Sequence, residues 1–103
     1  MTIATKNNST TKNKEDLKND KPKKYKVLVH NDDFTPFPFV LDIFQRYFRK
    51  NEQEAFLLTQ EVHKAGCAIA GIYTHDIAQT KISQVDSESY KEGHPLLLTC
   101  ELE

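Results

Sequence analysis

The sequence predicts an α+β fold in which a three-stranded antiparallel sheet packs against three helices, in the order β-α-α-β-α-β. Three short apolar segments, at residues 25–30, 67–73 and 96–102, have the length and composition of strands. The segments between them are longer and carry apolar residues at helical spacing. The chain has 103 residues and no internal repeat, which is the size of one domain.

A polar turn joins the first strand to the first helix. Residues 25–30 (Tyr-Lys-Val-Leu-Val-His) are rich in β-branched side chains and partly alternate, which predicts a strand. Residues 31–33 (Asn-Asp-Asp) follow at once, and such side chains favour turns because they bond to their own backbone. We expect Thr35 to cap the helix, which starts at Phe37 or Pro38 because the residue before a proline avoids helical geometry.

The buried face of each helix follows from the spacing of its apolar residues. In the first helix five residues recur at i, i+3, i+4, i+7 and i+8: Val40, Ile43, Phe44, Tyr47 and Phe48. Asn51 and Glu54 predict a capping box for the second helix, and Gly66 suits its C-terminal end. Its core face is expected to hold Ala55, Leu58, Val62 and Ala65. We expect Thr74 to cap the third helix and Gly93 to end it, with Ile77, Ile82 and Val85 facing inward.

Composition divides the chain after residue 24. Residues 1–24 have four hydrophobic residues, and seven lysines against three acidic residues give a net charge of +4. Residues 25–103 have seven basic and twelve acidic residues, a net charge of −5. The first segment buries too little apolar surface to offset its ordering entropy, so we expect a flexible N-terminal extension at 1–24 and a core domain at 25–103. The overall net charge of −1 argues against a nucleic-acid binder.

The sequence also bears on where the protein works. Its apolar runs are a few residues long, far below the ~20 that span a bilayer, so we expect no membrane association. Residues 1–24 have no apolar stretch typical of a secretory signal and no arginine typical of a transit peptide. Two cysteines, Cys67 and Cys100, do not make a disulfide framework and favour a reducing compartment. We therefore expect a cytoplasmic protein.

The densest polar cluster, residues 31–33, has two interpretations. It is either an exposed turn or, with Asp32 and Asp33 as ligands, a Mg²⁺ site for phosphoryl transfer or hydrolysis. The core has no glycine-rich phosphate loop to support the second interpretation. The histidines lack zinc-binding spacing, and both cysteines lie in predicted strands, where cysteine behaves as a small hydrophobe. We expect no metal and no cofactor.

From Tyr25 to Pro36, which includes the motif Asn-Asp-Asp-x-Thr-Pro, the sequence resembles the ClpS family, adaptors of the bacterial Clp protease. The resemblance continues through Phe39–Val40, Val62–His63, Gly66, Ala68–Gly71, Thr80–Lys81 and His94–Leu97. It covers residues 25–103 without a gap, and the family has a variable, flexible N-terminal extension. The resemblance implies a non-enzymatic adaptor that binds substrates with an N-terminal Phe, Tyr, Trp or Leu. It would deliver them to the N-terminal domain of a ClpA-like or ClpC-like ATPase for ATP-dependent degradation.

The resemblance implies a binding site with two parts. Four residues would bind the substrate's α-ammonium group: Asn31, Asp32, Asp33 and His63. An ammonium is a positive charge with three donors, so it needs clustered acceptors. Seven residues would form the pocket for the first side chain: Val29, Thr35, Phe37, Val40, Thr59, Val62 and Leu96. Because His63 would accept a hydrogen bond, we expect binding to weaken when the histidine is protonated at lower pH.

Two pocket positions depart from the family's usual pattern, because Phe37 and Thr59 stand where many relatives have methionine. Phe37 should still exclude β-branched residues, and the smaller Thr59 should make the pocket roomier and slightly more polar. We therefore expect a preference for aromatic first residues. Asp76 and Lys81 match positions implicated in docking on the ATPase, although either is equally consistent with ordinary charge on a helix surface.

Two alternatives remain beside the adaptor. One is the metal-dependent domain built on Asp32 and Asp33, and the other is a structural interaction domain without a peptide pocket.

Overall fold

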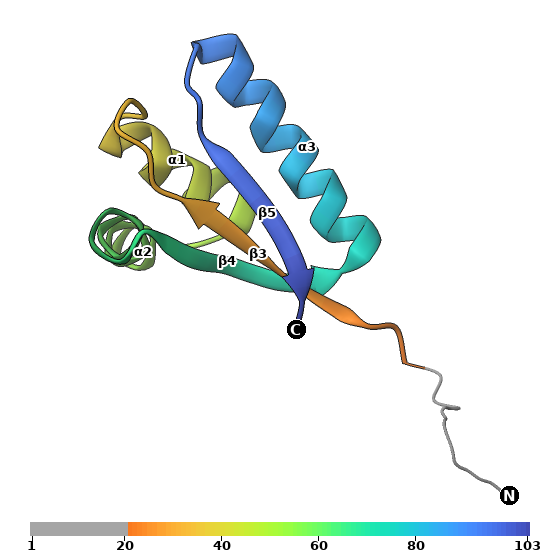
Figure 1. Ribbon diagram of the computed structural model, residues 1–103. Coiled ribbons are helices and arrows are strands. Elements are labelled where there is room, and N and C mark those ends of the chain that lie inside the picture. Colours follow the sequence, from red (N-terminus) through yellow and green to blue (C-terminus); the bar gives the residue numbers. More distant parts are fainter. Residues whose placement is uncertain (1–20) are drawn as a thin grey trace, which may run out of the picture.

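The computed structural model describes residues 21–103 and shows the predicted order of elements (Figure 1). The strands are β3 (Lys24–His30), β4 (Cys67–Thr74) and β5 (Leu97–Leu102), and the helices are α1 (Phe37–Phe48), α2 (Glu52–Ala65) and α3 (His75–Glu92). The predicted α+β class and element order are confirmed. Lys24 already belongs to β3, and the expected flexibility of the N-terminal extension falls almost wholly on residues 1–20, outside the described residues.

The sheet is antiparallel throughout and has the order β4-β3-β5, so β3 is the central strand. Tyr25 pairs with residues near the ends of both neighbours, and His30 pairs with Cys67 and Leu97 at their beginnings. The pairing with β4 shifts register between Val27 and Leu28, which marks a bulge. Because His30 pairs with Cys67, the C-terminal end of β3 lies beside the point where α2 passes into β4, as Figure 1 shows.

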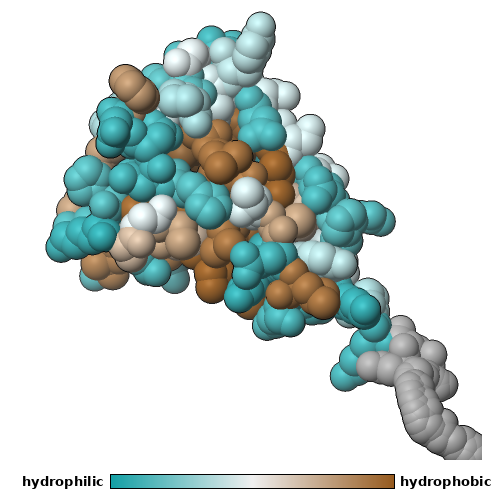
Figure 2. Space-filling view, viewed as in Figure 1, coloured by the Kyte–Doolittle hydropathy of each residue, from teal (hydrophilic) through white to brown (hydrophobic). Residues whose placement is uncertain are grey.

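The core lies between the helices and one face of the sheet. Val27 and Val29 on β3 have no exposed surface, and they belong to one buried cluster with Ile43 and Phe44 of α1, which are equally buried. The alternate strand residues point away from the helices, so that the other face exposes Ile69, Ile72 and Leu97 by about half. Figure 2 shows apolar side chains surfacing among polar ones on the side of the molecule drawn in Figure 1.

Helix α1 starts at Phe37, one of the two predicted positions, but its cap differs from the prediction. Pro36 occupies the N-cap position and makes no side-chain cap, while the hydroxyl of Thr35 bonds to Asp32 instead. Proline in the first turn is compatible with a helix because the first N–H groups have no intrahelical partner. The predicted stripe is confirmed, with Tyr47 half-buried at its edge.

Helix α2 has the predicted capping box and C-terminal glycine. The Asn51 side chain accepts from the Glu54 N–H at 2.7 Å, and the Glu54 carboxylate accepts from the Asn51 N–H at 3.0 Å. Gly66 ends the helix with a φ of 94°, a conformation that favours glycine. The prediction for Ala65 was wrong, because it is exposed. Thr59 is buried in the core-facing row with Ala55 and Val62, at i, i+4 and i+7.

Helix α3 ends at Gly93 as predicted, but its buried row is displaced by one residue at the start. Ile77 was expected inside and is 49% exposed, whereas Ala78 is fully buried. Ala78, Ile82 and Val85 follow one another at spacings of four and three, so Ile77 lies about 100° away from their row. Thr74 occupies the N-cap position, as expected, but its side chain makes no capping bond.

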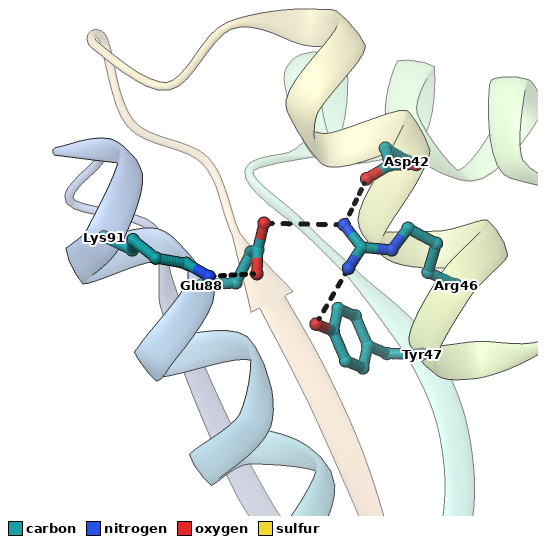
Figure 3. Close-up of polar contacts among 5 residues, drawn as sticks. All are labelled: Asp42, Arg46, Tyr47, Glu88 and Lys91. Carbon is teal, nitrogen blue, oxygen red and sulfur yellow. Dashed lines mark hydrogen bonds and ion pairs between the residues drawn. The ribbon is translucent and has the colours of Figure 1, made fainter.

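A polar network on the surface joins α1 to α3 (Figure 3). Arg46 pairs with Asp42 at 2.9 Å within α1 and reaches Glu88 of α3 at 3.5 Å, while Lys91 contacts the other oxygen of Glu88 at 4.0 Å. The phenol oxygen of Tyr47 also accepts a bond from Arg46 at 3.3 Å. The hydrogen bond to Asp42 raises the pKa of Arg46, whose guanidinium is charged at ordinary pH in any case. Exposed pairs of this kind contribute little to stability.

Across residues 21–103, no helix combines the length and the apolar character that a membrane crossing needs.

Candidate functional site

A cavity of about 410 Å³ opens where β3 ends and α2 meets α1. It is lined by nine residues from three segments: Asn31, Asp32, Asp33 and Thr35 from the loop, Phe37 and Val40 from α1, and Thr59, Val62 and His63 from α2. All nine belong to the eleven residues expected at the site. The side chains of Val40, Thr59 and Val62 are nearly buried and form an apolar floor. Asn31, Asp33 and His63 are exposed and supply polar groups at the rim.

Two of the expected pocket residues lie outside this lining. Val29 is fully buried in the central strand, and Leu96 is 6% exposed just before β5. Both belong to the hydrophobic core between sheet and helices. Val29 faces the helices from the middle strand and is covered by them. Neither Val29 nor Leu96 lines the cavity here, and their contact with a bound side chain stays a prediction.

The loop that carries the polar residues is held by Asp32. Its Oδ1 accepts from the N–H groups of Phe34 and Thr35, at 2.8 and 2.7 Å, and its Oδ2 accepts from the Thr35 hydroxyl at 2.7 Å. Partial burial acts to raise the pKa of Asp32, but these three bonds, with His94 nearby, outweigh it and leave the pKa below its ordinary value. Asp32 is therefore an ionised loop-forming residue with most of its acceptor capacity already used.

A backbone hydrogen bond joins the loop to the end of α2. The N–H of Asn31 donates to the carbonyl of Gly66 at 2.9 Å, and the N–H of Gly66 donates to the carbonyl of Val62 at 3.0 Å. The left-handed conformation of Gly66 makes this return of the chain possible. The bond places Asn31 close to the last turn of α2, which carries His63, so the two polar side chains line one cavity.

One phenylalanine ring, that of Phe37, forms a wall of the cavity. Phe37, in the first turn of α1, lines it and is 38% exposed. Its ring meets the ring of Phe56 from α2 edge-on, with centroids 5.6 Å apart and planes at 61°. Thr59 donates its hydroxyl hydrogen to the carbonyl of Ala55 at 2.6 Å. Its donor is thus used within the helix, and Thr59 adds room to the pocket more than polarity.

The arrangement suits a ligand with a cationic hydrogen-bonding head and an apolar side chain. The rim offers carboxylate, amide and imidazole acceptors, and the floor offers buried aliphatic groups. Within residues 21–103, no three or more His, Cys, Asp and Glu side chains gather in a way that could hold a metal ion. The bonds that engage Asp32 also leave little free capacity for a cation at the Asp32–Asp33 pair.

A family model described as "ATP-dependent Clp protease adaptor protein ClpS" matches residues 20–99. The chain belongs to the ClpS family. Three curated ClpS adapter proteins illustrate the similarity. That of Clostridium acetobutylicum is 49% identical over 86 residues, 84% of this chain and 85% of the relative. That of Deinococcus radiodurans is 46% identical over 83 residues, 81% and 74% of the two chains. That of Burkholderia thailandensis is 43% identical over 94 residues, 91% and 90%.

A solved ClpS structure has the same fold. Agrobacterium tumefaciens ClpS2 bound to L-phenylalaninamide superposes with a TM-score of 0.78 and 35% sequence identity. The match covers 81% of this chain and 100% of that one. The ClpS membership shows that the chain is an adaptor of the ATP-dependent Clp protease.

The two residues of this ClpS chain that were expected at the ATPase interface lie together on α3. Asp76 and Lys81 line a shallow depression of about 290 Å³ with Ile77, Thr80 and Gln84. Asp76 is exposed in the first turn, but Lys81 is half-buried and occupied. Its Nζ donates to the Tyr47 carbonyl at 2.8 Å and lies 5.3 Å from the Tyr73 ring centroid. Lys81 thus fastens α3 to the end of α1.

Phe56 is a residue beside the cavity of this ClpS chain that the sequence analysis missed. It precedes Thr59 by three positions and His63 by seven, so all three share one face of α2. That spacing was visible in the sequence. The contact of Phe56 with Phe37, nineteen residues earlier on another helix, was not visible there.

Proposed function

We propose that this chain binds proteins through an N-terminal Phe, Tyr, Trp or Leu and delivers them to a Clp ATPase for degradation. The observation that carries the proposal is a single cavity that joins Asn31, Asp33 and His63 at its rim to Val40, Thr59 and Val62 at its floor. A protein's first residue is the one residue that combines an α-ammonium with a side chain on the same carbon. L-Phenylalaninamide, the molecule bound to the similar ClpS2, has the same two groups.

The rim suits the ammonium by charge and by hydrogen bonding. Asn31 supplies a side-chain carbonyl, and neutral His63 supplies a ring nitrogen as an acceptor. The exposed carboxylate of Asp33 and the ionised Asp32 add negative potential. Asp32 acts chiefly by holding the loop, since Phe34 and Thr35 already bond to its oxygens. An acetylated N-terminus would leave acceptors unpaired, at about 1–3 kcal/mol per group.

The floor suits a large side chain that is aromatic or, like that of Leu, has no branch at Cβ. Burial of such a side chain is worth about 1.5–3 kcal/mol. The buried surfaces of Val40 and Val62 supply the apolar contact, and Phe37 forms the wall that a β-branched side chain would meet. Ammonium and side-chain recognition together exclude internal residues, because an internal residue has no charged amine.

Delivery of a bound substrate requires that the adaptor bind the substrate and the ATPase at the same time. The cavity and the expected ATPase surface lie at opposite ends of strand β3. The cavity follows His30 at one end of the strand, and Lys24 at the other end pairs with Thr74, two residues before Asp76. Seven strand residues span about 20 Å. We propose that the N-terminal domain of a ClpA-like or ClpC-like ATPase docks on the surface around Asp76 and Ile77. The N-terminal extension would enter the complex beside it, and the adaptor would work in the cytoplasm without catalysing a reaction.

Fluorescence anisotropy with a labelled peptide that begins with a free Phe tests the binding step. We expect binding that N-acetylation of the peptide abolishes and that neither EDTA nor Mg²⁺ changes. Asn31→Ala and His63→Ala should each weaken binding by at least about tenfold, because each removes an acceptor for a charged donor. Glu61→Ala, on the exposed side of α2 two residues before His63, is the matched control and should bind normally.

Three results would contradict the proposal. Equal binding of the acetylated peptide would remove the ammonium from recognition. Binding that requires Mg²⁺ would favour the metal-dependent alternative built on Asp32 and Asp33. Absence of binding to every peptide with a free Phe, Tyr, Trp or Leu would favour an interaction domain without a peptide pocket.

A further inference from the structure

Two phenylalanine rings on different helices meet at the mouth of the cavity. Phe37 lies in the first turn of α1 and Phe56 in the second turn of α2, and their rings are in edge-to-face contact at 5.6 Å. They remain 38% and 45% exposed, so neither is held by burial in the core. Aromatic pairs of this geometry attract each other beyond the effect of area burial. The contact with Phe56 therefore restricts the orientation of the Phe37 ring.

Only one of the two rings borders the cavity. Phe37 is part of its lining, and Phe56 is not. Phe56 nevertheless shares its helix face with Thr59 and His63, which do line the cavity, so it stands behind Phe37 at the same opening. A side chain placed in this way acts on a bound ligand through its neighbour.

We propose that Phe56 is a positioning residue for ligand selection, and this inference rests on the proposed binding of N-terminal residues. By packing against Phe37, Phe56 fixes the ring that forms one wall of the cavity mouth. A fixed wall excludes a first residue with a branch at Cβ and gives flat contact to an aromatic one. Without Phe56, the Phe37 ring rotates more freely, which costs affinity for aromatic residues and relaxes the exclusion of branched ones.

The test measures dissociation constants for matched peptides that differ only in their first residue, which is Phe, Leu or Val. In Phe56→Ala we expect the affinity for Phe to fall about two- to tenfold, the range of one aromatic contact. The ratio of Phe to Val affinity should fall with it. Phe56→Tyr keeps the ring and should restore the wild-type ratio. Leu57→Ala, an exposed neighbour on α2 that does not line the cavity, is the matched control and should leave all three affinities unchanged.

A double-mutant cycle separates positioning from direct contact. If Phe56 acts through Phe37, then Phe56→Ala has little further effect on affinity or on the Phe-to-Val ratio in a Phe37→Ala background. An undiminished effect in that background would show independent action and overturn the inference. An unchanged ratio in Phe56→Ala, with wild-type melting temperature, would also overturn it and leave the proposed function standing. Failure of the wild type to bind any of the three peptides would overturn both.

Discussion

Asp32 bonds to Thr35 through both of its carboxylate oxygens. Oδ1 accepts from the Thr35 backbone N–H and Oδ2 from the Thr35 hydroxyl, each at 2.7 Å. The pair closes the loop between β3 and α1 and thereby sets the direction in which Asn31 and Asp33 enter the cavity. Thr35 was expected to cap α1 and to line the pocket. Its two bonds to Asp32 show that it serves first to hold the Asp32 carboxylate in place.

Replacement of Thr35 tests this anchor. Thr35→Val keeps the shape of the side chain but removes the hydroxyl, which leaves one oxygen of Asp32 without a protein partner. We expect a loss of about 0.5–1.5 kcal/mol in the free energy of unfolding, measured by urea denaturation. Peptide affinity should fall as well because the loop is less ordered.

Thr35→Ser retains the hydroxyl and is the control for that variant. It should keep most of the stability and of the affinity. A loss in Thr35→Ser as large as that in Thr35→Val would show that the methyl group matters as much as the bond to Asp32, and would contradict the anchor.

The local features of the fold were predictable where they depend on neighbouring residues. The capping box of Asn51 and Glu54 and the glycine turn at Gly66 involve residues within one turn, so spacing alone indicates them. The stripe of α1 is aromatic and strong. The stripe of α3 is weak, with few apolar residues, so Ile77 and Ala78 competed for the inward position and tertiary packing decided between them.

The sequence named most of the residues that line the cavity, but it did not indicate which partners their side chains contact. The motif residues came from a family resemblance, and the structure brings most of them to one cavity. No pattern along the chain shows that an Asp32 oxygen accepts a hydrogen bond from the Thr35 hydroxyl, or that the Thr59 hydroxyl donates to the Ala55 carbonyl. Nor does it show that Phe56 meets Phe37, because that contact joins two helices. Such facts depend on side-chain orientation.

The pKa of Asp32 predicts how stability depends on acid. Its folded-state pKa lies below the ordinary value of 3.8, so the ionised form stabilises the fold. This contribution should be fully present above the ordinary pKa and should be lost as pH falls through the lower folded value. The difference in unfolding free energy between the wild type and Asp32→Asn should therefore be constant from about pH 8 to 5 and shrink below about pH 4. A difference that shrinks near pH 6 would contradict the assignment.

Peptide binding should depend on pH through a different group. Protonation of His63 would turn an acceptor into a cation that faces the substrate's ammonium, beside Asp32 and Asp33. We expect affinity to fall when His63 is protonated, by no more than about tenfold per pH unit for one proton. The pKa of Asp32 lies below its ordinary value of 3.8, so Asp32 stays ionised above about pH 5 and does not contribute there.

Titration of the same peptide in two histidine variants identifies the group. His63→Gln should bind more weakly and with a flat profile. His94→Gln, which removes the other histidine near Asp32, should keep the wild-type slope. A flat wild-type profile would exclude His63 as an acceptor.

The size of residue 59 should set the ranking of first residues. Thr59 lines the cavity with a short side chain, and we expect wild-type protein to bind aromatic first residues more tightly than Leu. Thr59→Met extends into the cavity and should weaken binding of a Trp peptide about tenfold, while it leaves a Leu peptide almost unaffected. Thr59→Val adds no length and should keep the wild-type ranking. Tighter wild-type binding of Leu than of every aromatic residue would contradict this account of the pocket.

Variants of Asp76 and Lys81 should distinguish a loss of ATPase binding from a loss of folding stability. Lys81→Met loses the bond to the Tyr47 carbonyl and the contact with the Tyr73 ring, so we expect a loss of about 1–2 kcal/mol and a melting temperature lower by roughly 5–10 °C. Asp76→Asn changes an exposed charge and should melt within a few degrees of the wild type. Both variants should bind the isolated N-terminal domain of the Clp ATPase more weakly in calorimetric titration, and both should bind a Phe peptide normally at 10 °C. Because Asp76→Asn keeps its fold, its loss of ATPase binding is the decisive result. Wild-type ATPase affinity in Asp76→Asn would move the docking surface away from the start of α3.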